Sequence, residues 1–527
     1  MRPRRTNEGE IVSASLTPYF SFSHSDYVLA LPMLLLTLFG VGVLLIDLLL
    51  PDQWKRVNAY TALVGVAFSA VAVGRLHLAY RAAERQGSEM ATFTGFMNSL
   101  VVDRFAIYFF YLFLLGTAIA ILMSVHYLEI EKESHGEFYA LMLFSVVGMM
   151  CMAAGYDIVL IFVGLELMAI STYVLVGFLR RDKRSNEAAL KYLLLGAFSS
   201  GIFAYGLSLF YGVSGSTNLG VIAQKLQADL VTRPNDAVVI FALLATATGL
   251  LFKIAAVPFH QWAPDAYEGA PTSITGFMSV AVKAAAWAML LRIFLFMLYP
   301  LRSMYVPLLI IVSIITMTVG NLAAISQNNL KRLLAYSSIA HVGYMLLGLV
   351  ASDGQNNSTG IMAIMIYLLV YTFMNLGAFA VITSLRRHNI IGDEIEDIAG
   401  LYFKAPTEAI LMLVFLLSLA GIPPLAGFWG KYFIFLSLIQ TGHYALAATA
   451  VLYALLGLYY YMRIANAMLM RPAVDSEPVQ TGPMMRLVLA VTAIGTVGIG
   501  LFPNFFINVT NWSLGAMQGS HVATLLR

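Results

Sequence analysis

Cysteine is nearly absent from this sequence, since Cys151 is the only one among 527 residues. One cysteine cannot form an intrachain disulfide, and it cannot supply the several thiolates that a cysteine-ligated zinc site or iron–sulfur cluster requires. Any redox cofactor with such ligands must therefore belong to a partner protein.

Charged residues are scarce as well. They make up 11% of the chain, against about 25% in an ordinary soluble domain. The net charge is +3, and no basic tract occurs beyond the RRDKR turn at 180–184. The sequence therefore does not indicate binding to nucleic acid.

Motifs that would place a cofactor or a catalytic nucleophile are missing too. We find no phosphate-binding loop, dinucleotide fingerprint, HExxH zinc motif or nucleophile elbow. The chain thus offers no candidate catalytic residue, no cofactor-binding residue and no metal ligand.

Apolar residues, in contrast, make up 60% of the chain. A run of about 17–25 apolar residues is long enough to cross a ~30 Å hydrocarbon core as a helix, and about fourteen such runs occur here. We therefore expect an all-α polytopic membrane protein with the lipid bilayer as a partner. The predicted spans are 27–50, 57–79, 102–126, 138–154, 157–179, 188–212, 238–258, 272–298, 304–325, 333–350, 360–385, 407–439, 444–470 and 484–503.

Two lysines of the stretch 250–292 lie inside these spans. Lys253 is in the run 238–258, and Lys283 is in the middle of the run 272–298. A charge near the bilayer centre is unfavourable by roughly 2.5–3.5 kcal/mol, so an intramembrane lysine indicates function and needs a partner or internal water.

Prolines break two of the spans. Pro258 interrupts the run that carries Lys253, while Pro423 and Pro424 interrupt a second run, with Lys431 shortly after them. A proline frees backbone carbonyls that hydrocarbon cannot satisfy, so each break predicts a polar cavity at membrane depth.

Three further titratable residues are candidates. Glu166 lies near the middle of a span, and a structural alternative is a glutamate satisfied by a hydroxyl such as that of Ser171. Lys191 follows Glu187 at i, i+4, which favours an ion pair, although its side chain could instead extend to the cytoplasmic interface. His341 lies two to three turns into a helix and is either a proton relay or a hydrogen-bonded core residue.

The loops predict an orientation. Basic residues in short loops favour the cytoplasmic side, and they gather in alternate loops here, which leaves both termini outside. A polar stretch after the first break, PDAYEGAP at 264–271, reads as a loop that either connects or lines a gate. The basic loops are Lys55/Arg56, Arg180–Arg184, Lys331/Arg332, Arg386/Arg387 and Arg471. Six arginines would lie on the outer side and so disagree with this orientation: Arg2, Arg4, Arg5, Arg75, Arg81 and Arg85.

The two breaks suggest an internal repeat. Interrupted helices at corresponding places of two halves point to inverted repeats and an ion path near the midplane. We expect one membrane domain over 1–527, with helices 4–8 at 138–300 as a first inverted five-helix repeat and helices 9–13 at 301–471 as a second.

Several long motifs resemble the antiporter-like membrane subunits of respiratory complex I, the proton-pumping NADH:quinone oxidoreductase. Lysine at 431 and the short chain after the last helix resemble its N-type subunits rather than the M-type or L-type. The motifs are SNEAALKYLLLGAFSS, LFKIAAVPFHQWAPDAYEGAPT, NLAAISQNNLKRLLAYSSIAHVGYMLLG and LAGIPPLAGFWGKYFIF.

The resemblance implies a proton relay. Glu166 and Lys253 would form an ion pair, Lys283 would be the central relay group, and Lys431 would lie beside the exit route. Lys191 and His341 match positions associated with the same hydrophilic axis.

It also implies a setting. NADH, FMN, iron–sulfur clusters and quinone are expected in partner subunits, with no cofactor in this chain. The partners would be other membrane and peripheral subunits, in the inner membrane of a bacterium.

Three alternatives remain from the sequence. The first is a subunit of a Mrp-type sodium/proton antiporter, which shares the glutamate, the lysines and the broken helices. The others are a subunit of an energy-converting hydrogenase and a non-conducting scaffold, although retained buried charges argue against the scaffold.

Overall fold

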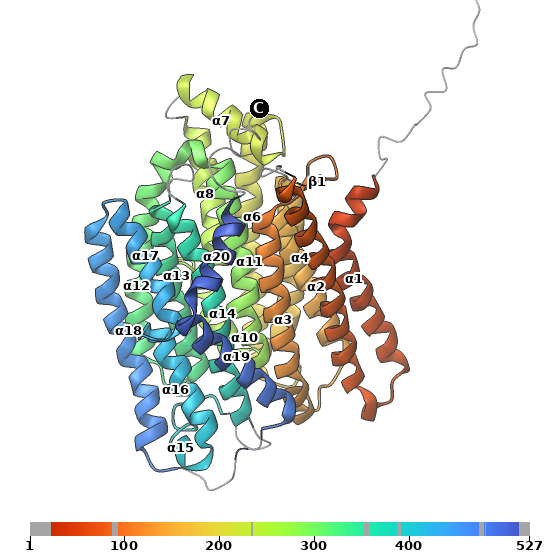
Figure 1. Cartoon of the computed structure of the whole chain (residues 1–527), viewed down its shortest axis with the longest axis vertical. Coiled ribbons are helices and arrows are strands. Elements are labelled where there is room, and N and C mark those ends of the chain that lie inside the picture. The colour runs from red at the N-terminus through yellow and green to blue at the C-terminus, as the bar shows by residue number, and fades with distance from the viewer. Residues whose placement is uncertain are drawn as a thin grey trace, which may run out of the picture.

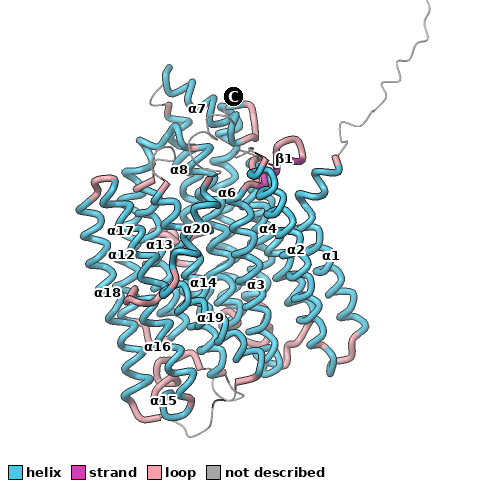
Figure 2. The backbone as a smooth tube through the Cα atoms, viewed as in Figure 1, coloured by secondary structure: helices cyan, strands magenta, loops and turns pink. Residues whose placement is uncertain are grey.

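A computed structural model describes residues 23–86, 93–232, 236–352, 358–386, 392–473, 479 and 481–515. Helices run side by side along the long axis of the molecule, and the loops gather at its two ends (Figures 1 and 2). The expectation about the N-terminal end falls on residues 1–22, and the C-terminal end on 516–527, which lie outside the described ranges.

Twelve of the described helical segments are long and apolar enough to cross a membrane. They confirm the predicted all-α polytopic class. Eleven are single helices: α1 (His24–Leu49), α2 (Arg56–Arg85), α3 (Arg104–Glu131), α4 (Gly136–Ala154), α5 (Ile158–Val176), α6 (Lys183–Ser214), α12 (Arg302–Ser326), α13 (Leu330–Val350), α14 (Thr359–Leu385), α18 (Tyr444–Met470) and α19 (Pro483–Leu501).

The twelfth segment is compound. It starts as α10 (Thr272–Phe277), passes through a π-helical turn at Met278–Val282 and continues as α11 (Lys283–Arg292), with a second π-helical turn at Ile293–Met297. Isolated π-helical turns are frequent at functional sites. The first of them ends directly before Lys283.

Each of the two predicted breaks separates two helices. The first lies between α8 (Ala237–Lys253) and α9 (Trp262–Gly269), which begins beyond the predicted span 238–258, and the second lies between α16 (Pro406–Ala420) and α17 (Ala426–Gln440). Both breaks contain a cis X-Pro bond, at Val257-Pro258 and Pro423-Pro424.

The reading of PDAYEGAP as a polar loop is wrong, because most of this stretch forms helix α9. Pro264 does not prevent the helix, since it lies in the first turn, where backbone N–H groups have no intrahelical partner. The stretch is therefore the second half of the broken helix, and its carboxylates lie on an ordered element.

Several short elements were not predicted. They are α7 (Leu219–Thr232), α15 (Leu401–Lys404), α20 (Pro503–Leu514), the 3-10 turns Asp52–Trp54 and Tyr299–Leu301, and a hairpin of β1 (Phe93–Gly95) and β2 (Leu100–Val102). The hairpin is antiparallel, with Thr94 opposite Val101. It lies at the same end of the bundle as α7, and α15 lies at the opposite end (Figure 1).

Aspartates cap the N-terminal ends of several helices. Each accepts a hydrogen bond from a backbone N–H of the first turn and so pairs a donor that the helix itself leaves free. The caps are Asp103 for α3, Asp157 for α5, Asp182 for α6 and Asp236 for α8.

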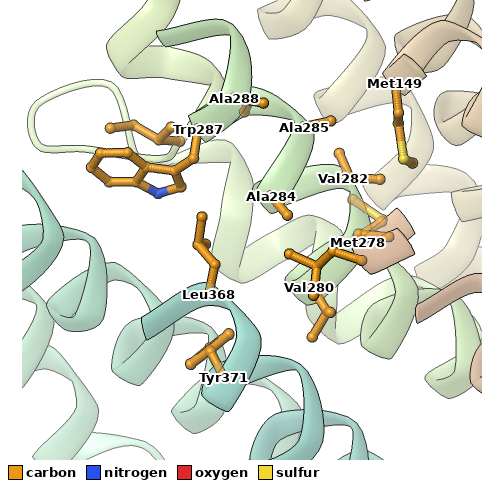
Figure 3. Packing of buried hydrophobic residues seen from close by; sticks show 14 of the residues in the cluster. Met149, Met278, Val280, Val282, Ala284, Ala285, Trp287, Ala288, Leu368 and Tyr371 are labelled. Carbon is orange, nitrogen blue, oxygen red and sulfur yellow. The ribbon is translucent and has the colours of Figure 1, made fainter. Parts of the chain in front are cut away.

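The compound segment α10–α11 forms the centre of the bundle. It is buried along its whole length and packs against α3, α4 and α14. Figure 3 shows Met149 of α4 on one side of it and Leu368 and Tyr371 of α14 on the other. Lys283 therefore lies in the protein interior and does not face lipid.

Small residues let neighbouring helices approach closely. Where α4 crosses α5, a Cβ at Gly148 would lie 2.5 Å from the Gly164 carbonyl oxygen and 2.6 Å from the Met168 nitrogen. Both neighbours are backbone atoms that cannot rotate away, so only glycine fits at Gly148.

We expect Gly148→Ala to destabilise the protein by about 1–3 kcal/mol, the usual effect of overpacking. The measurement is thermal unfolding of the detergent-solubilised protein. Gly201→Ala is the matched control, because nothing lies within 4 Å of a Cβ at that position. Equal melting temperatures for the two variants would contradict the close crossing.

Candidate functional site

Lys253 is the last residue of α8, where the first broken helix stops. Its side chain is buried, and its Nζ donates a hydrogen bond to the Tyr173 hydroxyl of α5 at 3.3 Å. The ring of Tyr173 also lies 5.8 Å from the ammonium nitrogen. A neutral phenol therefore holds Lys253 in this structure.

Glu166 lies on the same face of α5, two turns before Tyr173. Its Oε1 is buried without a hydrogen-bond partner among the described residues. The expected Glu166–Lys253 pair is thus brought onto facing helices without a direct contact.

The alternative prediction, in which a hydroxyl such as that of Ser171 hydrogen-bonds Glu166, is not supported for Ser171. Ser171 Oγ donates to the Leu167 carbonyl of its own helix. Both neighbours of Glu166 on the outer face, Val163 and Ile170, are 56% exposed. The carboxylate therefore lies at the border between the interior and the lipid-facing surface of α5.

Lys283 is buried at the start of α11, next to the π-helical turn. Its Nζ hydrogen-bonds the hydroxyl of Ser338 on α13 and lies 3.4 Å from the carbonyl oxygen of the same residue. The central predicted relay group is thus connected to the helix that carries His341.

His341 lies between two tyrosines. Its Nδ1 is 2.5 Å from the Tyr367 hydroxyl of α14, and its Nε2 is 3.0 Å from the Tyr461 hydroxyl of α18. The Tyr461 hydroxyl also hydrogen-bonds Ser337, which precedes the serine that holds Lys283. A histidine bonded at both ring nitrogens is compatible with either a relay or a core role.

Lys431 lies on α17, just beyond the second break. Its Nζ donates to the carbonyl oxygens of Leu419 at 3.1 Å and Ala420 at 2.7 Å. These are the last two residues of α16, whose carbonyls have no intrahelical partner. The break therefore supplies the oxygens that hold the buried ammonium group, and the Tyr344 ring lies 5.4 Å away.

The backbone of both breaks is hydrogen-bonded by side chains. At the first, Val257 N donates to Thr316 Oγ1 and Trp262 Nε1 donates to the Phe252 carbonyl. At the second, Gly427 N donates to Ser418 Oγ. The interruptions at Pro258, Pro423 and Pro424 are therefore built features of the fold.

Lys191 lies apart from the other candidates. Its side chain is 45% exposed and contacts Glu187 at 2.8 Å and Asp265 at 3.0 Å, so the predicted i, i+4 pair is present. Arg332 contacts Asp265 at 2.7 Å and Glu268 at 2.8 Å. These five side chains line a cavity of about 230 Å³ at the end of α9.

The interior also contains a buried ion pair that was not predicted from the sequence. Arg292 and Asp103 side chains are 1% and 5% exposed, and they form two hydrogen bonds of 3.1 and 2.9 Å. Arg292 also donates to the Ala153 carbonyl at 2.7 Å. The sequence contained an indication of this pair, because Arg292 is a charged residue inside the predicted span 272–298, as Lys283 is.

The described residues thus bring Lys253, Lys283, His341 and Lys431 into the interior of the bundle, bonded to hydroxyl, phenol and carbonyl oxygens. Within the described ranges, no group of three or more His, Cys, Asp or Glu side chains could hold a metal ion. Groups that gain and lose protons, set inside a helix bundle, can pass protons. This is the arrangement of antiporter-like membrane proteins.

Comparisons with known proteins agree with this class. Residues 155–457, more than half of the chain, match the family described as "NADH:quinone oxidoreductase/Mrp antiporter, TM". The chain is 67% identical over 505 residues to NADH-quinone oxidoreductase subunit N 1 of Koribacter versatilis, covering 96% of this chain and 98% of the relative. The chain belongs to the subunit N family of NADH-quinone oxidoreductases.

Solved structures support the same family. A chain of respiratory complex I from Thermus thermophilus with bound Aureothin is 32% identical, with a TM-score of 0.74 over 90% of this chain and 98% of that one. A chain of the Mrp complex from Dietzia sp. DQ12-45-1b also has a TM-score of 0.74, covering 94% and 100%, but at 21% identity it shows only a shared fold. The N-type resemblance is confirmed.

Asp265 lies in the surface ionic cluster on α9, which is not among the twelve segments long and apolar enough to cross a membrane. Burial alone raises the pKa of this carboxyl, but hydrogen bonds from Lys191 and Arg332 outweigh burial and hold the pKa below its ordinary value. A depressed carboxyl pKa stabilises the folded state above about pH 4, and this stability is lost as pH falls through the folded-state pKa.

We therefore expect Asp265→Asn to lower stability by about 1 kcal/mol at pH 7, and the difference from the parent protein to shrink below about pH 4. The measurement is thermal unfolding across this pH range. Glu137→Gln is the control, because the Glu137–Arg180 pair is 3.9 Å apart with exposed side chains. A constant difference at all pH values would contradict the role of the carboxylate.

Proposed function

We propose that this chain is a proton-translocating membrane-arm subunit of a NADH:quinone oxidoreductase. The observation that carries the proposal is the burial of Lys253, Lys283 and Lys431 inside the bundle, each bonded to neutral oxygen atoms. An ammonium group held by neutral oxygens gives up its proton more readily than one paired with a carboxylate. Three such groups in one bundle are suited to successive proton transfer.

The electron transfer that drives this movement belongs to other subunits. The family resemblance and the names of the relatives support a setting in which NADH, FMN, iron–sulfur clusters and quinone are bound by partners. This chain would be coupled to them through the membrane and peripheral subunits with which it assembles.

In the relay that we propose, Glu166 controls Lys253. A carboxylate close to Lys253 favours its charged form, and separation of the two charges lets Lys253 release its proton. The proton then passes to Lys283 and to Lys431, with His341 between them. Lys191 would act at the surface, where its cluster opens to water.

Two inverted repeats, 138–300 and 301–471, would form the frame of this relay. In the first half α4 packs along α5 and the broken α8–α9 packs on α6, and in the second α12 packs along α13 and the broken α16–α17 packs on α14. The matching helix pairs support the repeat, in which Lys253 and Lys431 each lie beside a break.

We propose the inner membrane of a bacterium as the location, with the ends of α5, α12, α14 and α18 on the cytoplasmic side. The basic residues that indicated this side in the sequence, among them Arg180, Arg332, Arg386 and Arg471, form ion pairs with acidic side chains. With this orientation the N-terminal end of α1 faces outward.

The Mrp-type antiporter is the weaker candidate. Its likeness to this chain extends to the fold at 21% identity, whereas the relative at 67% identity is named as a quinone oxidoreductase subunit.

We expect Lys253→Ala and Glu166→Ala to abolish most proton pumping while the complex stays assembled, because each removes one partner of the control pair. The measurement is the proton-to-electron ratio in inverted membrane vesicles. Lys225→Ala, on the exposed surface of α7, is the control. Wild-type ratios in the first two variants would reject the relay.

We also expect the chain to purify in mild detergent with subunits that carry flavin and iron–sulfur clusters and reduce quinone with NADH. The measurement is the cofactor content and activity of the isolated particle. Isolation with multispanning partners alone, without any cofactor, would favour the antiporter.

A further inference from the structure

The separated state of Glu166 and Lys253 is built into the packing around Tyr173. Lys253 Nζ bonds to the Tyr173 hydroxyl, while the buried Glu166 Oε1 has no hydrogen-bond partner among the described residues. A buried carboxylate oxygen without a partner is unfavourable. Contacts elsewhere must therefore hold Lys253 at the phenol.

Aromatic packing fixes the ring of Tyr173. Its ring meets Tyr192 of α6 edge-to-face, with centroids 4.5 Å apart, and Tyr192 stacks on Trp262 of α9 at 4.5 Å. Trp262 in turn donates to the Phe252 carbonyl, in the residue before Lys253. The rings of Tyr173, Tyr192 and Trp262 thus pack in a row, and the hydrogen bond from Trp262 connects this row to the end of α8.

A missing side chain makes room for the hydroxyl. The ring carbon Cζ of Tyr173 would lie 2.7 Å from a Cβ at Gly196 of α6, and the hydroxyl would lie closer still. Only glycine at this position allows the phenol to reach Lys253. Three helices therefore place the hydroxyl: α5 carries Tyr173, α6 leaves space at Gly196, and α8 supplies Lys253.

We propose that Tyr173 is a positioning residue of the proton relay, whose hydroxyl holds Lys253 away from Glu166 in the state that releases the proton. A neutral hydroxyl stabilises an ammonium group less than a carboxylate does, so Lys253 is the better proton donor when it is bonded to Tyr173. The side chain would alternate between the carboxylate, where it is loaded, and the phenol, where it is unloaded. This inference rests on the proposed function, because it assigns a second partner to Lys253.

Tyr173→Phe tests the proposal, since it removes the hydroxyl and keeps the ring. We expect the pumping rate of the assembled complex to fall roughly tenfold, because Lys253 stays paired with Glu166. Tyr305→Phe is the control: it removes a buried hydroxyl that donates to the Phe294 carbonyl, away from Lys253, and its rate should stay within about twofold of the parent. Equal losses in both variants would overturn the proposal.

A cryo-EM structure of the Tyr173→Phe complex gives an answer that does not depend on turnover. The Lys253 ammonium should move to within about 4 Å of the Glu166 carboxylate. An unmoved Lys253 would reject the inference, whereas wild-type pumping by Lys253→Ala would reject the proposed function itself.

Discussion

An ammonium group inside a helix bundle must find oxygen atoms, and the rest of this structure is arranged to provide them. Lys431 bonds to the carbonyls that end α16, Lys283 to the hydroxyl of Ser338, and Lys253 to the phenol of Tyr173. None of these oxygens carries a formal charge. The bundle therefore tolerates the charged lysines without fixing them in that form, which is the property a proton carrier needs.

The broken helices follow from the same constraint. The carbonyls inside a helix accept from its own N–H groups, whereas the last four carbonyls have no intrahelical partner and are free to accept from a neighbouring side chain. By stopping at Ala420, α16 presents two carbonyls to Lys431, and the Ser418 hydroxyl pairs the backbone N–H at the start of α17. The break thus creates a polar site at membrane depth while leaving its own backbone hydrogen-bonded.

The two charged regions of the protein are built differently. The cluster of Lys191, Asp265 and Arg332 consists of paired opposite charges around an open cavity, and its members stay charged near neutral pH. The interior lysines have neutral partners. The side chains of the surface cluster therefore keep their charge near neutral pH, whereas the interior lysines can gain and lose a proton.

The sequence alone determined the spanning helices, because an apolar run of the right length has one stable form in hydrocarbon. It also identified Lys253, Lys283 and Lys431, since charges in such runs stand out. It could not identify Tyr173 and Ser338 as their partners, or Gly196 as the residue that leaves room for the Tyr173 hydroxyl, because hydroxyls and glycines are common in spanning helices and nothing local distinguishes one from another.

Only the tertiary structure decided which groups meet. It showed that Glu166 and Lys253 face each other without touching, that PDAYEGAP is helical, and that Arg292 pairs with Asp103. These contacts join residues far apart in the chain, and they depend on helix rotation and crossing rather than on spacing along one helix. The sequence specifies which charges must be buried, and the packing of the helices decides what each buried charge contacts.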